Sequence, residues 1–300
     1  MNKVLILGGY GNFGKRIATA LTKSGIAVII AGRDEKKVQD LAAILPKCLS
    51  EIAVFDVNKN LSSELEKLKP AVVINTCGPF QESGYEVAET CINHKVHYID
   101  ISDGRKFVTG ITAFNEKARE AGITVISGSS TVPGLSSAVL EHYRQEFSEM
   151  DSLKYGISPG QKAERGLATT KAIMSYVGKP LSPFSGKKKI AYGWQDIYCQ
   201  EYPGLGKRWM ANCDIPDLDL FPAHYGIKSI QFSAGLELGF MHLGLWLVSW
   251  LVRAGPPIHL PNYSAPLLRI SNWFNIFGSS DGGMHIIIKG KDKETNHVQL

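Results

Sequence analysis

A glycine-rich turn directly after a short apolar stretch restricts the fold more than any other feature of this sequence. Residues 4–7 read VLIL and run straight into GGYGNFG at residues 8–14. The apolar stretch has the length of a buried parallel strand, and Ile17 and Leu21 then follow at helical spacing. A strand, a turn with few side chains and a helix, in this order, begin a βαβ unit. The N-terminus of such a helix offers free N–H groups, so the sequence predicts that phosphate lies against the turn.

Three glycines in this turn, Gly9, Gly11 and Gly14, have the spacing G-x-G-x-x-G. The first makes the tight bend, the second lets the backbone approach a pyrophosphate, and the third lets helix and strand pack closely. The alternative is a glycine-rich turn without a ligand, which the position between a strand and a helix disfavours. The sequence therefore predicts a dinucleotide site at Gly8, Gly9, Tyr10, Gly11, Asn12, Phe13 and Gly14.

Short apolar stretches alternate with helical patterns over the first 130 residues. Such alternation is typical of a parallel sheet covered by helices on both faces, so the fold class is α/β with a Rossmann doubly wound sheet. We expect this domain to span residues 1–130 and a second domain to span residues 131–300. The expected strands are 4–7, 27–32, 52–55, 71–78, 97–101 and 123–127, and the expected helices include 62–69, 85–93 and 107–121.

The second domain has a less regular pattern. The sequence predicts helices at 134–147 and 166–178 and strands at 153–158, 190–199 and 227–234. We interpret Lys187, Lys188 and Lys189 as exposed turn charges and not as a phosphate site.

The end of the second expected strand bears on which nicotinamide dinucleotide is bound. An acidic residue about 20 residues after the glycines would bind the ribose diol of NAD. Here the strand ends Gly32-Arg33-Asp34, and Lys36 and Lys37 follow. Arg33 can pair bidentately with a 2′-phosphate, which favours NADP. Two alternatives stay open: Arg33 as a solvated loop residue with Asp34 as a helix cap, and Asp34 as a ligand of NAD.

Further candidates follow the third and fourth expected strands. The carboxyl ends of the first and fourth strands flank the cofactor crevice in this architecture. The fourth strand runs into NTCGPF, where Gly78 permits close backbone approach, Pro79 stiffens the loop and Phe80 is placed to form a wall beside the nicotinamide. Asp56 is placed to approach the adenine edge or to remain a surface aspartate. We interpret Cys77 as a buried, inert thiol that lines the same site.

Charge and cysteine content exclude several other classes of protein. The net charge is +5, and no basic stripe is interleaved with aromatic residues, so we expect no nucleic-acid partner. The five cysteines include no C-x-x-C pair, and the His94-x-x-His97 pair has no third ligand nearby, so we expect no metal site. No signal segment precedes the first strand, which predicts a cytoplasmic, reducing location.

Motifs along nearly the whole chain share one known pattern. They are GGYGNFG, AGRD, NTCGPF, HYIDISDGR and SGSSTVPGLSSAV in the first half, and RGLATTKAIMSYVGKP, CDIPDLDLFPA and AGLELGFMHLGLWL in the second. Together they resemble the saccharopine dehydrogenase-like oxidoreductases, above all the short bacterial proteins that carry a saccharopine dehydrogenase NADP-binding domain. The resemblance implies a second, α+β domain with a mixed sheet. It also implies a final segment that returns to the nucleotide domain, so we expect the sequence to be truncated at its C-terminal end.

The stretch LGFMHLGLWLVSWLV at 238–252 is apolar all round a helix, yet shorter than the about 20 residues that span a bilayer. Such a helix is buried in the core or at a contact between copies, so we expect a homo-oligomer. The alternative is peripheral membrane contact, which the two tryptophans favour. Helical spacing places His242, Trp246 and Trp250 on one stripe and Leu243, Leu247 and Leu251 beside it.

Hydride transfer needs a group that moves a proton near the substrate. The candidates beyond the fifth strand are Tyr98, Asp103 and Arg105, and the Asp-Gly-Arg turn is suited to hold a carboxylate. Alternatively, Asp103 caps the helix that follows. These residues favour an NADP-dependent oxidoreductase that acts on an unidentified small or lipid-like substrate. Because no recognisable proton-relay motif is present, a non-catalytic dinucleotide-binding sensor or scaffold is the alternative.

Overall fold

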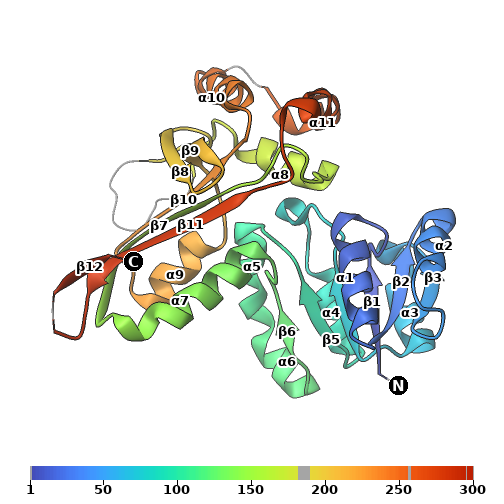
Figure 1. The fold of residues 1–300 in the computed structure, drawn as a ribbon. Helices are drawn as coiled ribbons and strands as arrows, with labels where there is room; N and C mark the ends of the chain where they lie inside the picture. Colours follow the sequence, from blue (N-terminus) through green and yellow to red (C-terminus); the bar gives the residue numbers. More distant parts are fainter. Residues whose placement is uncertain (1, 182–189, 256–257, 295, 300) are drawn as a thin grey trace. The chain divides into compact units, whose positions relative to one another are not determined.

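The computed structural model describes residues 2–181, 190–255, 258–294 and 296–299 of the chain. The chain divides into two compact units, Met1–Leu135 and Ser136–Leu300 (Figure 1). The sequence analysis places this boundary between residues 130 and 131. Each unit has its own six-stranded sheet, and each is described separately.

The first unit is a parallel sheet in the strand order β3-β2-β1-β4-β5-β6, which confirms the predicted Rossmann fold. Its strands are β1 Lys3–Leu7, β2 Ala27–Gly32, β3 Ser50–Val54, β4 Val72–Asn75, β5 His97–Asp100 and β6 Val125–Ile126. Its α-helices are α1 Asn12–Lys23, α2 Glu35–Ala43, α3 Val57–Leu68, α4 Glu86–Asn93, α5 Arg105–Gly110 and α6 Asn115–Ala121.

Alternate residues of the central strand face opposite layers of helices. Leu5 and Leu7 of β1 belong to the core cluster that includes side chains of α3 and α4. Ile6 belongs to the other cluster, with side chains of α1 and α2. All three side chains are buried, and burial of such a side chain contributes about 1.5–3 kcal/mol. Since the strand order reverses between β1 and β4, the carboxyl ends of these two strands flank a crevice.

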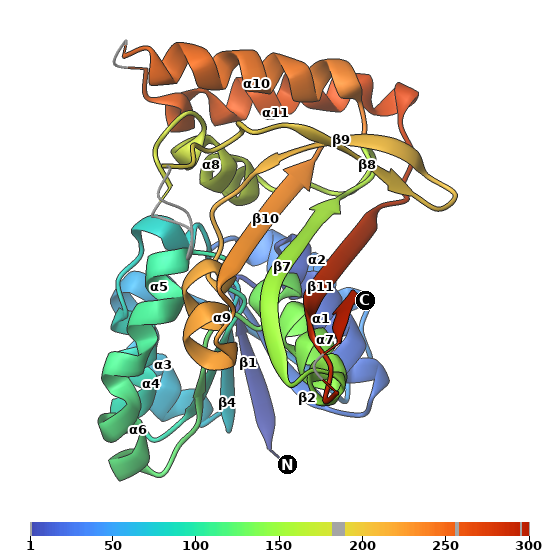
Figure 2. The same ribbon diagram turned by 90° about the vertical axis from the view of Figure 1, so that its left-hand side faces the viewer.

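The second unit is a mixed sheet in the order β12-β11-β7-β10-β9-β8, in which only β7 and β10 run parallel among the pairs described (Figure 2). This confirms the predicted α+β architecture. The rings of Tyr155, Phe221 and Phe232 meet in its core. Its strands are β7 Glu149–Ser158, β8 Tyr198–Tyr202, β9 Gly206–Asn212, β10 Ser229–Gly235, β11 Gly283–Lys291 and β12 His297–Gln299, and its α-helices are α7 Ser136–Tyr143, α8 Leu167–Tyr176, α9 Asp217–Tyr225, α10 Gly239–Arg253 and α11 Ser264–Trp273.

Two sequence-based expectations about elements are wrong. The helix expected over 107–121 is divided into α5, a 3₁₀ turn at Ile111–Phe114 and α6, because the run Val108-Thr109-Gly110 has low helix propensity. The strand expected from residue 190 begins only at Tyr198, since Trp194 and Asp196 have φ angles of 60° and 53°, which no strand accommodates. The predicted turn charges Lys187, Lys188 and Lys189 lie outside the described residues.

A buried carboxyl links α9 to the sheet of the second unit. Asp217, in the first turn of α9, is fully buried. Its Oδ2 accepts hydrogen bonds from the Tyr155 hydroxyl at 2.7 Å and the Ser136 hydroxyl at 2.5 Å. Burial raises the pKa of Asp217 to about 6 despite these two donors. The native state therefore binds a proton at a pH where the unfolded chain has released it.

We expect Asp217→Asn to remove a pH-dependent loss of stability. A raised carboxyl pKa means that stability is lost as pH rises from about 4 through about 6, and the shift from 3.8 to about 6 corresponds to about 3 kcal/mol of unfolding free energy. Asparagine mimics the protonated carboxyl, so the variant should be more stable than the wild type at pH 8 and similar at pH 4. Chemical denaturation at both values measures this, with the exposed Asp219→Asn as the control. Equal pH dependence of Asp217→Asn and wild type would contradict it.

Candidate functional site

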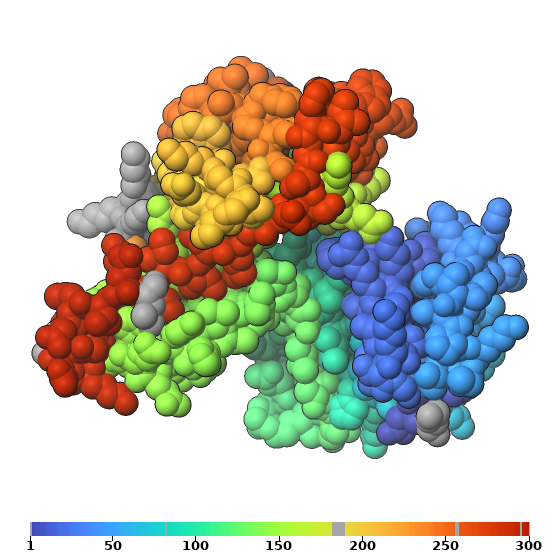
Figure 3. All heavy atoms as spheres, in the orientation of Figure 1, coloured from blue at the N-terminus to red at the C-terminus, as the bar shows by residue number. Residues whose placement is uncertain are grey.

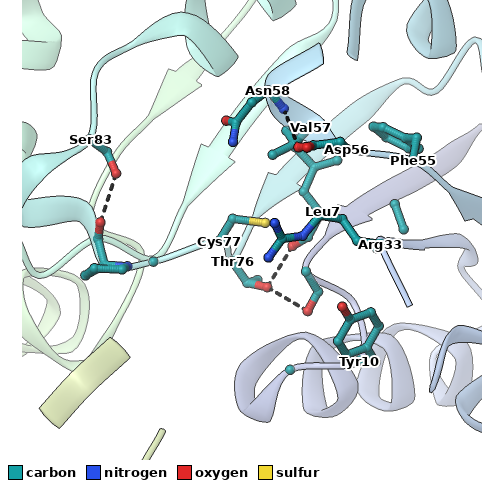
Figure 4. A pocket seen from close by; sticks show the side chains of 16 residues that line it. Leu7, Tyr10, Arg33, Phe55, Asp56, Val57, Asn58, Thr76, Cys77 and Ser83 are labelled. Atoms are coloured by element: carbon teal, nitrogen blue, oxygen red, sulfur yellow. Dashed lines mark hydrogen bonds between the residues drawn. The ribbon is translucent and has the colours of Figure 1, made fainter. Parts of the chain in front are cut away.

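A cavity of about 400 Å³ opens in the first unit at the carboxyl ends of β1, β2 and β4 and at the start of α3 (Figure 4). It lies at the topological switch point, where α/β sheets bind ligands. Backbone and small side chains form much of its wall, which suits a ligand that makes close main-chain contacts. The lining residues are Leu7, Gly8, Tyr10, Gly11, Ala31, Gly32, Arg33, Phe55, Asp56, Val57, Asn58, Thr76, Cys77, Gly78, Pro79 and Ser83.

The glycine turn is held tightly against the end of the sheet. Gly8 has a φ of +71°, and its carbonyl accepts hydrogen bonds from the Gly11 N–H at 2.9 Å and the Thr76 hydroxyl at 3.2 Å. The Gly9 N–H donates a hydrogen bond to the Ala31 carbonyl of β2 at 2.9 Å. A Cβ on Gly14 would lie 2.4 Å from the Gly8 carbonyl oxygen, so only glycine lets α1 start this close to the turn.

The first turn of α1 has no side-chain cap. Gly11 occupies the N-cap position in an extended conformation, and no side chain accepts a hydrogen bond there. The first N–H groups of a helix need an acceptor, and they carry the positive end of the helix dipole. The turn therefore retains the donors for an anion. Asn12, Phe13 and Gly14 form this first turn without lining the cavity, and Phe13 is about half exposed.

Arg33 and Asp34 have separate places although they are neighbours in sequence. Arg33 lines the cavity, and its side chain extends across it toward Cys77 (Figure 4). Asp34 does not line the cavity: its carboxylate accepts the Lys37 N–H at 3.1 Å and pairs with the Lys37 ammonium at 3.2 Å. Asp34 is therefore the N-cap of α2, as one of the two alternatives predicts, but Arg33 lines the cavity and is not the solvated loop residue of that alternative. Backbone and side-chain hydrogen bonds to Lys37 lower the pKa of the Asp34 carboxyl.

Aromatic and polar side chains form the wall near β2 and β3. A Cβ on Gly32 would lie 2.2 Å from Cε1 of the Tyr10 ring, so this glycine makes room for the ring. The Lys37 ammonium lies 5.7 Å from the centre of the Tyr10 ring. Asp56 lines the cavity and also caps α3, because its Oδ1 accepts the Asn58 N–H at 3.1 Å. Helix α3 consequently begins at Val57, five residues before the expected 62.

The loop after β4 forms the opposite wall. The Thr76 hydroxyl donates to the Leu7 carbonyl at 2.7 Å, which joins the loop to the end of β1. Burial raises the pKa of the Cys77 thiol to about 11, and the nearby Arg33 charge opposes this only partly. A thiol that stays protonated is a poor nucleophile, as the sequence-based interpretation expects, although Cys77 is half-buried and not buried. Gly78 and Pro79 line the cavity beside it.

Phe80 does not form the expected wall of the cavity. Its side chain is buried and packs against Phe107, with ring centres 5.3 Å apart. The 3₁₀ turn that begins at Phe80 directs this side chain into the core of the first unit. The predicted contact with a nicotinamide is therefore not supported by its position.

The three candidate catalytic residues lie in different environments. Tyr98 is fully buried in the core, where its hydroxyl accepts a hydrogen bond from the Asn75 amide at 3.3 Å and burial raises its pKa. A role in proton transfer to a substrate is therefore wrong for Tyr98. Asp103 is exposed and accepts the Gln81 amide at 2.9 Å, while Gly104, and not Asp103, occupies the N-cap of α5. Arg105 begins α5 and is buried.

Sequence reasoning missed several lining residues, of which Asn58, Thr76 and Ser83 are polar. Thr76 precedes Cys77 in the motif NTCGPF, and Asn58 follows the capping Asp56 by two residues. A rule that polar residues just beyond each parallel strand face the crevice would have found both. Among the described residues, no three His, Cys, Asp or Glu side chains lie close enough together to hold a metal ion.

Comparisons with known proteins agree with this geometry. Residues 4–126 match the family described as saccharopine dehydrogenase NADP binding domain, which confirms the resemblance for this part of the chain. Curated proteins include no match to the sequence. Residues 4–126 are therefore similar to an NADP-binding domain of saccharopine dehydrogenase, and this match covers less than half of the chain.

Three solved structures are similar over most of the chain. A probable dehydrogenase from Thermotoga maritima is 9% identical, with 99% of this chain and 75% of that one covered at a TM-score of 0.51. GenD2 from gentamicin A biosynthesis, solved with NAD, is 12% identical, with 100% and 72% covered at 0.46. The WlbA dehydrogenase from Thermus thermophilus, solved with NAD and α-ketoglutarate, is 10% identical, with 100% and 83% covered at 0.44. At 9% identity the likeness to the Thermotoga maritima protein concerns the fold alone, and the TM-scores of the other two structures are too low to show even that.

Proposed function

We propose that the protein is an NADP-dependent oxidoreductase of the saccharopine dehydrogenase-like type, which transfers hydride to or from a small or lipid-like substrate. The observation that carries the choice of NADP is the separation of Arg33 from Asp34. The guanidinium of Arg33 lies in the cavity, while the carboxylate of Asp34 is turned toward α2 and paired with Lys37. An NAD site would have the reverse arrangement, with an acidic side chain toward the ribose.

The residues present fit a dinucleotide. A Cβ on Gly8 would lie 2.9 Å from the Thr76 hydroxyl oxygen, so glycine keeps this part of the cavity wall open to a ligand, and the uncapped start of α1 supplies donors for a pyrophosphate. Arg33 would hold the 2′-phosphate, Asp56 and Asn58 the adenine edge, and the loop from Thr76 to Pro79 the nicotinamide end. When bound, NADP supplies the hydride or accepts it.

Proton transfer needs a group of the protein itself. Because Tyr98 is enclosed in the core, Asp103 and Arg105 are the candidates that stay predictions. The Gln81 amide orients the Asp103 carboxylate by its 2.9 Å hydrogen bond. An oriented carboxylate at an exposed position can exchange protons with solvent and with a bound substrate.

We expect NADPH to bind at least about tenfold more tightly than NADH, because the extra phosphate gains a charge-assisted hydrogen bond from Arg33. Titration followed by nicotinamide fluorescence measures both affinities, and equal affinities or a preference for NADH would contradict the choice of NADP. A screen of carbonyl and imine metabolites for oxidation of NADPH tests the enzymatic role. Tight NADPH binding without oxidation across that screen would favour the alternative of a non-catalytic sensor or scaffold.

A further inference from the structure

Exposed apolar side chains gather on one pair of helices in the second unit. We call this surface the apolar helical face; it comprises outward side chains of α10, of α11, of the 3₁₀ turn Phe274–Phe277 that follows α11, and of the link between the helices. The atoms of α10 and α11 lie at the surface in the space-filling view, in orange and red-orange at the top (Figure 3). Its exposed members are Phe240, Leu247, Trp250, Leu251, Ile258, Tyr263, Leu267, Ile270, Trp273, Ile276 and Phe277.

Helix α10 is not enclosed in the core of the second unit, so of the roles that its sequence allows, a contact between copies and a membrane contact remain. In α10 only His242 and Ser249 are buried. His242 packs beside the Trp194 ring at 5.2 Å, and the Ser249 hydroxyl donates to the Trp246 carbonyl at 2.6 Å. Four apolar side chains of α10 are exposed, namely Phe240, Leu247, Trp250 and Leu251, and its other apolar side chains are half-buried.

The two helices present their apolar side chains together. They lie side by side, and the rings of Phe240 and Phe274 meet edge to face with centres 5.1 Å apart (Figures 1 and 2). Helix α10 has 15 residues and so measures about 22 Å, less than the about 30 Å of a hydrocarbon core. No helix among the described residues combines the length and apolar character needed to cross a bilayer.

The charged side chains of α10 and α11 are both basic. Between Glu237 and Asp281 the sequence contains no acidic residue, whereas it contains Arg253 and Arg269. Glu237 is directed inward, where its carboxylate pairs with Arg208 at 3.2 Å. Helix α8, which packs against α11, adds the exposed Lys171. The Arg253 guanidinium donates to the Gln195 amide oxygen at 2.7 Å, and Arg269 adds a second exposed cation, so a partner that accepts apolar groups and offers anions at its edge would complement this face.

We propose that the apolar helical face binds the interface of a membrane that contains anionic phospholipid, with α10 and α11 lying in its plane. Tryptophan and phenylalanine at the depth of the headgroups, with arginine beside them, are typical of interfacial helices. A second copy of the chain fits less well. Two-fold pairing would bring Arg253 and Arg269 of both copies together without a carboxylate between Glu237 and Asp281 to neutralise them.

Sedimentation of the full chain with vesicles tests the proposal. We expect binding to vesicles of phosphatidylcholine with phosphatidylglycerol, at least about tenfold stronger than binding to phosphatidylcholine alone, and weaker in high salt. Arg269→Gln should weaken binding by about fivefold, the effect of one basic residue near an anionic surface. The double variant Trp273→Ser/Phe277→Ser should weaken it by about tenfold or more. Protein that stays in the supernatant with anionic vesicles would overturn the proposal.

A matched pair of variants distinguishes binding through the apolar helical face from nonspecific adsorption of any exposed apolar side chain. Ile276 on the apolar helical face and Ile44 in the first unit are both 77% exposed. Ile276→Ser should reduce vesicle binding while Ile44→Ser leaves it unchanged, and equal effects would overturn the proposal. Light scattering after size-exclusion chromatography measures the oligomeric state and so tests whether a second copy of the chain binds this face instead. A dimer that Trp273→Ser/Phe277→Ser dissociates, together with no vesicle binding, would show that a second copy covers the face.

Discussion

Arg33→Gln is expected to reduce the affinity for NADPH by about 100-fold and the affinity for NADH by less than about threefold. The guanidinium lies in the cavity, and it can make two parallel hydrogen bonds to a phosphate that NADH lacks. A hydrogen bond to a charged group contributes about 1.5–3 kcal/mol, and about 2.8 kcal/mol corresponds to 100-fold. Glutamine keeps a polar side chain of similar reach but lacks the charge. Fluorescence titration of both dinucleotides measures the change in selectivity.

A charge-matched control makes this result specific to the site. Arg119→Gln removes a guanidinium from α6 in the same unit, where it pairs with Glu116 at 3.0 Å and does not line the cavity. It should leave both affinities unchanged. If Arg33→Gln weakened NADPH and NADH equally, the arginine would act on the shape of the cavity and not on the 2′-phosphate.

Gly14→Ala is expected to abolish detectable binding of either dinucleotide and to lower the free energy of unfolding by about 2 kcal/mol. The added Cβ would lie 2.4 Å from the Gly8 carbonyl oxygen and 2.7 Å from the Gly9 Cα. Both contacts are with backbone, so α1 has to move away from the turn, and overpacking of this kind costs about 1–3 kcal/mol. The uncapped N–H groups at the start of α1 then no longer converge with the turn on one anion. Calorimetric titration and chemical denaturation measure the two effects.

Gly244→Ala provides the opposite case. Gly244 lies inside α10, and nothing is within 4 Å of an added Cβ. Alanine there should stabilise the protein by about 0.5–1 kcal/mol and leave dinucleotide binding unchanged. Wild-type dinucleotide affinity in Gly14→Ala would show that close packing of α1 on the turn is not required for binding.

The residues that line the cavity illustrate which features a sequence reveals. Gly8, Gly11 and Arg33 were predicted because the turn and the strand end have strict spacing along the chain. Thr76 was missed, since its hydroxyl reaches the Leu7 carbonyl only once β4 lies beside β1. Asp34 was left with two open roles, and the distance to its own neighbour Lys37 decides for the cap.

Orientation of side chains separates the correct predictions from the wrong ones. Tyr98 and Phe80 were assigned to the site from their positions just before and after loops, yet both side chains enter the core. A difference of one residue along a strand or turn reverses the face on which a side chain lies. The sequence pattern of α10 likewise predicts an apolar helix without showing which of its side chains the rest of the unit covers.

The sequence by itself determined the order of strands and helices in the first unit, the glycine turn and the cation at the end of β2. These depend on backbone conformation and on spacing within a few residues, which local composition controls. The tertiary structure alone decided which of two adjacent side chains faces the cavity, which candidate acids are enclosed in the core and which apolar residues of α10 and α11 remain at the surface. These depend on contacts between segments far apart in the chain, and the packing of those segments is a property of the whole unit.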